Sequence, residues 1–139
     1  MTNSVRPDVS ALTVPMDAWS QPFWDAAAEH RLVMPHCQDC GRFRWPAGPF
    51  CPNCRSQRLA WVPPGTARIY SFTLLPVASG GDEPPRLRCP ALVEFDDAEG
   101  VRLVTSIVDS PIADIQIGAA VEVDWIAAAN ATAPVFRTR

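Results

Sequence analysis

The sequence contains no lysine: all 12 of its basic residues are arginine, against 15 acidic residues and a formal net charge of −3. This acidic balance argues against a broad nucleic-acid-binding surface, because such surfaces need many clustered basic residues and a high isoelectric point. A local cluster of positive charge is still compatible with the sequence. Its members lie within or just after one short segment: Arg42, Arg44, Arg55 and Arg58.

Long apolar runs are also missing, and none approaches the roughly 20 residues that a membrane-spanning helix requires. The first residues, MTNSVRPDVSALTVPMD, have no charged-then-apolar pattern, so we expect a cytoplasmic protein without a membrane partner. With 139 residues, 47% of them hydrophobic and 19% charged, the chain suffices for one ordinary folded domain or two very small ones. In a reducing compartment, paired cysteines are metal ligands more often than disulfides.

Residues suited to catalysis are scarce. His30 falls in a predicted helix and His36 stands beside a cysteine pair, and neither histidine has an evident nucleophile as a partner. The acidic residues between 96 and 99 fall in a predicted turn, which favours a solvated surface over a paired acid and base. Cys89 begins a predicted strand, where a structural thiol is a simpler interpretation than a nucleophile. We therefore predict no catalytic residues.

The N-terminal third of the chain contains one predicted helix. Residues 1–16, the N-terminal arm, contain two prolines and little periodicity, which predicts a mobile or loosely packed segment. Ser20 is a residue type that caps helices, and Pro22 is tolerated in a first turn. Helix-spaced apolar residues then predict an amphipathic helix over about 21–31, preceded by a shorter turn near 16–19.

Beyond VPPGT at 62–66, the apolar residues alternate as they do in β-strands. We predict strands in TARIYSFTLLPV, CPALVEFD, VRLVTSIVD and AVEVDWIA, with a short fifth strand in PVFRTR. The turn-rich stretch at 96–100 favours a hairpin. The first strand would place one set of side chains together on a face: Arg68, Tyr70, Phe72 and Leu74. Successive short strands without helices between them predict a small barrel.

Four of the five cysteines form two C-x-x-C pairs, Cys37/Cys40 and Cys51/Cys54, with ten residues between the pairs. Two such turns facing each other supply four thiolates, which fill the shell of a tetrahedral zinc ion and leave no open position for substrate. Such a site is structural. Iron uses the same ligand set and stays open as an alternative, whereas a redox pair is disfavoured because neither pair opens a predicted helix. His36 is interpreted as a bystander.

These features, in this order, resemble the family of zinc-ribbon, OB-fold proteins that accompany thiolases. The resemblance covers about 21–137 and depends on the PFW helix start, FRWPAGPFCPNC at the cysteine pairs, the strand GTARIYSFT, and IGAAVEV near the end. It implies a mainly β fold with an N-terminal arm and helix (1–34), a rubredoxin-like zinc ribbon (35–63) and a C-terminal five-stranded OB-fold barrel (64–139).

The resemblance also implies a function. Members of this family are usually non-catalytic subunits, so we expect a hetero-oligomer with a thiolase-like or lipid-transfer-protein-like enzyme whose acyl-CoA chemistry the chain supports. That chemistry would be Claisen-type condensation and cleavage or retro-aldol cleavage. Arg42 and Arg44 are candidates for contacts with acyl-CoA, because guanidinium groups bind phosphate bidentately. The alternative, which the sequence favours, is that they are solvated or balance the negative charge of the zinc site. Trp45 and Trp61 are candidates for the core or for partner contacts.

The alternative function is a single-stranded nucleic-acid-binding module, because OB barrels and zinc ribbons both occur in such proteins. Tyr70 and Phe72 would then form a platform on which bases stack. The same two side chains share their predicted face with Leu74, which is equally typical of a barrel core, and the acidic charge balance disfavours this function.

Overall fold

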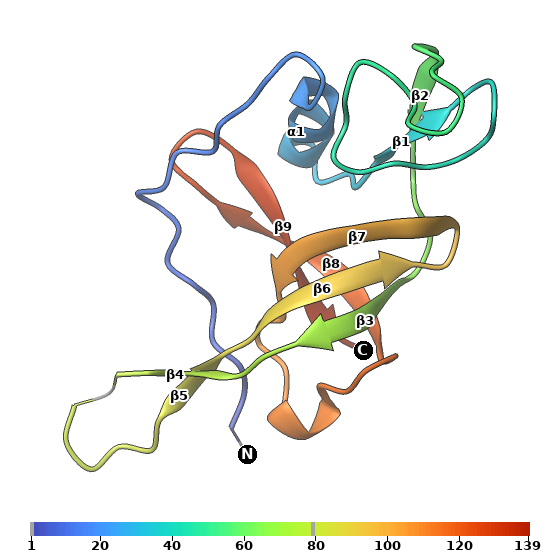
Figure 1. Ribbon diagram of the computed structural model, residues 1–139. Helices are drawn as coiled ribbons and strands as arrows, with labels where there is room; N and C mark the ends of the chain where they lie inside the picture. The colour runs from blue at the N-terminus through green and yellow to red at the C-terminus, as the bar shows by residue number, and fades with distance from the viewer. Residues whose placement is uncertain (1, 79) are drawn as a thin grey trace.

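The computed structural model describes residues 2–78 and 80–139. Within these residues the fold is mainly β, with one α-helix, a small ribbon that carries the cysteine pairs, and a curled five-stranded sheet that forms an OB-type half-barrel. Figure 1 shows the helix and the ribbon side by side above the barrel, while the chain before the helix runs along the outside of the barrel.

The helix, α1, spans Gln21–Ala28 and begins as predicted, with Pro22 in its first turn. Its apolar stripe buries Phe23, Ala26 and Ala27. The helix ends three residues earlier than the sequence pattern indicates, because His30 adopts a left-handed conformation with φ of 57° that a helix cannot continue through.

Ser20 occupies the N-cap position of α1 as predicted, but its side chain makes no capping hydrogen bond to the helix. The Ser20 hydroxyl accepts a hydrogen bond from the backbone N–H of Asp17 at 3.2 Å, and the Asp17 carboxylate accepts one from the Ser20 N–H at 2.7 Å. The two residues therefore form a closed turn before the helix, at the place where the sequence predicts a turn.

The prediction of a loosely packed N-terminal arm is wrong for the described residues. Ser4 is only 2% exposed, and its N–H donates to the carbonyl of Ser110 at 2.8 Å. Arg6 forms ion pairs with Asp109 at 2.7 Å and with Asp124 at 2.5 Å. The arm is thus fixed to the barrel by partners from the far end of the sequence, which local periodicity does not reveal.

The ribbon is built on two short antiparallel strands, β1 (Met34–Cys37) and β2 (Leu59–Val62). Their register pairs Met34 with Val62 and Cys37 with Leu59. The chain between the strands holds both cysteine pairs, so that the ends of the whole segment are held together by strand pairing.

The barrel sheet has the strand order β7-β6-β3-β8-β9, with all neighbours antiparallel. The five predicted strands are all present. Their bounds are β3 Ala67–Phe72, β6 Pro90–Phe95, β7 Ala98–Ser106, β8 Ala120–Ala127 and β9 Thr132–Thr138. The edge strands β7 and β9 meet near one end, where the N–H of Val108 donates to the Phe136 carbonyl at 2.8 Å. The sheet therefore curls into a half-barrel.

Two connections extend this sheet. The segment after β3 forms a short hairpin of β4 (Leu75–Val77) and β5 (Arg86–Arg88), which projects from the barrel in Figure 1. The crossing between β7 and β8 contains a single turn of 3₁₀-helix, Ile112–Asp114. Both lie where the sequence indicates a loop or a crossing segment.

The predicted faces of β3 are partly wrong because the strand contains a β-bulge. Ala67 and Ile69 point into the core, and the register with β6 shifts between Ile69 and Ser71. The bulge leaves Tyr70 outside the regular pairing and 41% exposed, whereas Phe72 packs against the core. A bulge of one residue moves the following side chains to the other face of a strand.

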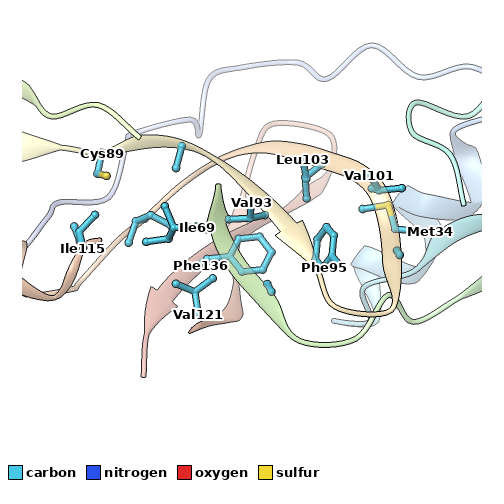
Figure 2. Packing of buried hydrophobic residues seen from close by; sticks show 14 of the residues in the cluster. Met34, Ile69, Cys89, Val93, Phe95, Val101, Leu103, Ile115, Val121 and Phe136 are labelled. Carbon is cyan, nitrogen blue, oxygen red and sulfur yellow. The ribbon is translucent and has the colours of Figure 1, made fainter. Parts of the chain in front are cut away.

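The hydrophobic core fills the barrel and continues into the ribbon. Figure 2 shows Cys89 and Ile115 at one end of the buried cluster and Met34, from ribbon strand β1, at the other. Met34 is fully buried in the same cluster as Phe95 and Val101. Because a ribbon side chain completes the barrel core, the ribbon and the barrel share one packed interior.

Candidate metal centre

The two cysteine pairs form backbone turns of the same pattern, over residues 37–42 and 51–56. In each turn the N–H of the first cysteine donates to the carbonyl of the sixth residue at 2.8 Å. The N–H of the fifth residue donates back to the carbonyl of the first cysteine, at 3.0 Å in the first turn and 2.8 Å in the second. We call these turns the first and second knuckles.

The fifth position of each knuckle requires a left-handed backbone. The first knuckle has Gly41 there with φ of 78°, and the second has Arg55 with φ of 65°. Glycine adopts this conformation without steric cost, whereas a residue with a Cβ atom is strained in it. The second knuckle therefore holds its shape against a local preference, which points to support from outside the turn.

The knuckles bring four sulfur atoms together at metal-ligand spacing. The Sγ atoms of Cys37 and Cys54 are 3.6 Å apart, as are those of Cys40 and Cys51, and all four lie within 4.8 Å of one another. Four ligands at about 2.3 Å from a tetrahedral zinc ion lie about 3.8 Å apart. A disulfide would need about 2.05 Å, and all four thiols are free. This cluster is consistent with metal binding.

Backbone N–H groups favour the thiolate form of the first cysteine in each knuckle. Hydrogen bonds from the N–H of Cys40 and, more weakly, of Asp39 lower the pKa of Cys37 to about 6. The N–H of Cys54 does the same for Cys51, whose pKa is also lowered. Because thiolates are the form that binds metal, these amides prepare the site for a cation.

The two arginines singled out in the sequence have different environments. Arg42 is exposed at the end of the first knuckle. Arg44 is only 7% exposed, and its Nη2 donates to the carbonyl of Gly48 at 3.1 Å. Its Nε and Nη1 atoms are buried without a hydrogen-bond partner. The fold therefore buries one of the two arginines and exposes the other, so the pair does not form a single exposed site of positive charge.

The two tryptophans singled out in the sequence are both half-buried. Trp45 packs its ring against Phe23 of α1 with centroids 4.5 Å apart, and Trp61 lies on β2 opposite Pro35. Both pack against the buried cluster of the barrel. They join helix, ribbon and barrel, and each keeps an exposed edge.

A cleft of about 740 Å³ lies between the ribbon and the turn that joins β6 and β7. Its ribbon wall consists of residues 41–44 and 51–53, and its barrel wall of Asp97, Glu99 and Gly100. The cleft thus carries arginine side chains on one wall and carboxylates on the other. The acidic residues that the sequence assigns to a solvated turn are exposed, and two of them, Asp97 and Glu99, line this cleft.

Two exposed apolar side chains were not singled out by sequence reasoning. Phe50, which directly precedes the second knuckle, is 56% exposed, and Val104 on β7 is 78% exposed. The prolines and glycine around Phe50, in PAGPF, are the one signal in the sequence that this residue belongs to a loop rather than to a packed element.

The remaining reactive side chains have structural contacts. Burial raises the pKa of Cys89 to about 11, which keeps this thiol neutral and unreactive at neutral pH. His30 stacks on Trp125 with ring centroids 5.4 Å apart, and His36 Nδ1 lies 3.1 Å from Nε2 of Gln38. These contacts hold the helix end and the ribbon in place.

The proposed base-stacking platform is not formed as a flat aromatic surface. The guanidinium of Arg102 lies over the Tyr70 ring, 3.9 Å from its centroid, and covers one face of it. Phe72 packs against the barrel core. Among the described residues, no helix has the length and apolar character needed to cross a bilayer.

Comparisons with known families match the two parts of the chain separately. Residues 24–60 match the ChsH2 rubredoxin-like zinc ribbon domain, and residues 61–125 match the ChsH2 C-terminal OB-fold domain. Together the two matches cover most of the sequence and meet at the end of the ribbon.

Solved structures and a curated protein give further relatives. A structure described as an Ltp2-ChsH2(DUF35) aldolase is 35% identical, with a TM-score of 0.74 over 91% of this chain and 98% of that one. A DUF35-family protein of unknown function from Sulfolobus solfataricus, 17% identical with a TM-score of 0.61, shares the fold. A probable enoyl-CoA hydratase alpha subunit from Thermomonospora curvata is 39% identical over 121 residues, which are 83% of this chain. The matched part spans only 36% of the length of that protein.

Proposed function

Because the chain belongs to the ChsH2 family of zinc-ribbon and OB-fold proteins, we propose that it is a non-catalytic accessory subunit of a thiolase-like enzyme in the cytoplasm. The observation that carries this proposal is the 35% identity, over nearly the full length of both chains, to a protein whose name pairs Ltp2 with ChsH2(DUF35) in an aldolase. The name of the enoyl-CoA hydratase subunit supports acyl-CoA as the substrate class of the partner.

The metal in this proposal is zinc, held by Cys37, Cys40, Cys51 and Cys54. The donor set fits: four free thiols lie within 4.8 Å of one another, and backbone amides favour two of them as thiolates. A zinc ion in a four-thiolate shell stabilises the local fold and offers no vacant position for substrate. Binding of structural zinc contributes about 10–16 kcal/mol in small finger peptides. The knuckles would hold the 34–62 ribbon in shape for the partner to recognise.

The partner surface in this proposal lies around the cleft between ribbon and barrel. Phe50 offers an exposed aromatic ring, the kind of side chain that anchors protein interfaces. Arg42 is exposed on the cleft wall and is free to bind a CoA phosphate at the shared interface. The exposed edges of Trp45 and Trp61 would add contact area. The partner's reaction would be Claisen-type condensation or cleavage of an acyl-CoA, or retro-aldol cleavage.

Co-expression with the thiolase-like protein encoded beside this chain tests the proposal. We expect a stable hetero-oligomer by pull-down and mass spectrometry, and no acyl-CoA turnover by the chain alone. Phe50→Ala should weaken the complex tenfold or more, since a central aromatic anchor contributes about 2 kcal/mol or more. The matched control is Ile117→Ala, because Ile117 is 66% exposed on the crossing segment, away from the ribbon.

Two results would overturn this assignment. Steady thioester cleavage by the purified chain without a partner would make it an enzyme in its own right. Failure to associate with any thiolase-like protein, together with tight single-strand binding that weakens steeply with salt, would favour the nucleic-acid-binding alternative.

A further inference from the structure

Arg44 combines burial with an incomplete set of hydrogen bonds. Its guanidinium makes one side-chain hydrogen bond, from Nη2 to the carbonyl of Gly48, while Nε and Nη1 are buried without a partner. A buried cation without an opposite charge nearby is among the most unfavourable arrangements in a protein interior. A residue retained in this state is expected to have a negatively charged neighbour.

The other arginines of the ribbon do not share this situation. Arg58 is paired with Asp39, with its Nη1 2.6 Å from the carboxylate. Arg42 and Arg55 are exposed, so water screens their charges. Within the described part of the chain, the ion pairs found do not include Arg44. Arg44 is therefore the buried positive charge of the ribbon.

The cysteine cluster, once it holds a metal, is a candidate source of this negative charge. Four thiolates around a divalent ion leave a net charge of −2. In the sequence Arg44 lies between the two knuckles, and its backbone N–H donates to the carbonyl of Pro35, two residues before Cys37, at 3.0 Å. Its side chain binds Gly48, three residues before Cys51, and Arg44 and Cys51 line the same cleft.

The carboxylates across the cleft are the competing source of negative charge. Asp97 and Glu99 line the opposite wall, but both are exposed and belong to the barrel turn. Water screens an exposed carboxylate much more than it screens a partly buried thiolate cluster. The unpartnered Nε and Nη1 of Arg44 are themselves closed to solvent, so a soluble anion has no direct access to them either.

We infer that Arg44 is the charge-balancing residue of the metal–thiolate centre. Its buried guanidinium offsets the excess negative charge of the four thiolates, and this raises the affinity of the site for a divalent metal. Its Nη2 contact with Gly48 is a separate function that holds the loop between the knuckles. This inference depends on the proposed metal site, and it assigns to Arg44 a role different from contact with CoA.

Three substitutions in the full chain separate charge from loop support. Arg44→Lys keeps the positive charge but loses the planar fork that binds Gly48. Arg44→Gln removes the charge but keeps an N–H donor of suitable type for Gly48. Arg42→Gln removes an exposed charge two positions away and is the matched control. Metal affinity is measured by competition between the protein and a chelator for Co²⁺ and Zn²⁺, with near-ultraviolet circular dichroism as the check of folding.

The expected result is that Arg44→Gln binds metal at least about tenfold more weakly than the wild type, as the loss of a buried opposite charge requires. Arg44→Lys and Arg42→Gln should stay within about threefold of the wild type. Wild-type affinity in Arg44→Gln would overturn the inference. So would an Arg44→Lys variant as weak as Arg44→Gln, because loop support and not charge would then determine affinity.

The same measurement distinguishes failure of this inference from failure of the zinc site. Wild-type protein with Co²⁺ should show the visible absorption of a tetrahedral four-sulfur site. If it shows none, the metal proposal and the role of Arg44 both fail. If the wild type binds Co²⁺ and Arg44→Gln binds it equally well, only the role of Arg44 fails. Should Arg44→Gln not fold, Arg44→Met serves as the uncharged variant: a metal affinity at least about tenfold below that of Arg44→Lys is expected, and an affinity equal to that of Arg44→Lys overturns the inference.

Discussion

Gly65 lies in the short link between ribbon and barrel, and replacing it with alanine should loosen that junction. The residue has φ of 86°, and a Cβ atom built there would lie 2.5 Å from Oδ2, 2.7 Å from Cγ and 3.0 Å from Cβ of Asp97. The same link is bound to the β6–β7 turn on both sides of Gly65. Asp97 N–H donates to the Pro64 carbonyl at 3.0 Å, and Asp96 N–H to the Thr66 carbonyl at 2.9 Å.

Gly118 provides a comparison that separates the cost of the left-handed backbone from the cost of the close contact with Asp97. It has the same φ of 86°, but a Cβ atom there meets open space. Gly118→Ala should therefore lower the free energy of unfolding only by the cost of placing alanine in a left-handed backbone conformation, about 1–2 kcal/mol. Gly65→Ala carries that cost and must also displace Asp97, including its Cβ atom, which adds about 1–3 kcal/mol as in other overpacked sites.

Urea denaturation of the metal-loaded chain, followed by tryptophan fluorescence, measures both variants. Adding Asp97→Ala removes the two closest atoms, so the cost of Gly65→Ala in that background should fall towards the cost of Gly118→Ala. If Gly65→Ala and Gly118→Ala are equally stable, the close approach of Gly65 and Asp97 contributes nothing. The argument that this contact joins ribbon to barrel would then be refuted.

Three further outcomes are expected. Cys37→Ser should lose the metal by elemental analysis and leave the chain insoluble or unable to bind its partner; a soluble, partner-competent variant would contradict a structural metal. Arg55→Gly should stabilise the metal-loaded protein by up to about 1 kcal/mol in urea, because the left-handed strain of the second knuckle is relieved. Arg6→Met should cost about 1 kcal/mol or less at pH 7, since both partners are partly exposed. The hydrogen bond from Arg6 lowers the pKa of Asp124 in the folded protein. The stability that the pair contributes is therefore complete above pH about 4, and it is lost as the pH falls through this lowered pKa. A stability difference between wild type and Arg6→Met that grows in acid would refute this reasoning.

The features that local sequence determines were predictable. The strand AVEVDWIA coincides with β8 at Ala120–Ala127, because strict alternation over eight residues leaves little choice of register. The knuckles were predictable for the same reason, since each C-x-x-C turn closes its own hydrogen bonds within six residues. The start of α1 follows from Pro22 and the residues just before it.

The features that were missed depend on distant partners. Ser4 is buried by Ser110, and nothing near Ser4 in the sequence announces that contact. The bulge at Tyr70 arises where β3 must curve between β6 and β8. Arg42 and Arg44 look equivalent in the sequence RFR, and only the folded ribbon buries one and exposes the other. Burial of individual polar residues is a tertiary property, which composition and periodicity do not report.

The N-terminal arm has a consequence for the order in which the chain assembles. Ser4 binds Ser110, which lies 106 positions later in the sequence, so the arm can dock only after most of the barrel has been made. The ribbon closes over far shorter separations and can acquire its ion early. Long-range closure slows folding. Refolding should accordingly show an early metal-dependent phase and a later one in which the arm seals the barrel.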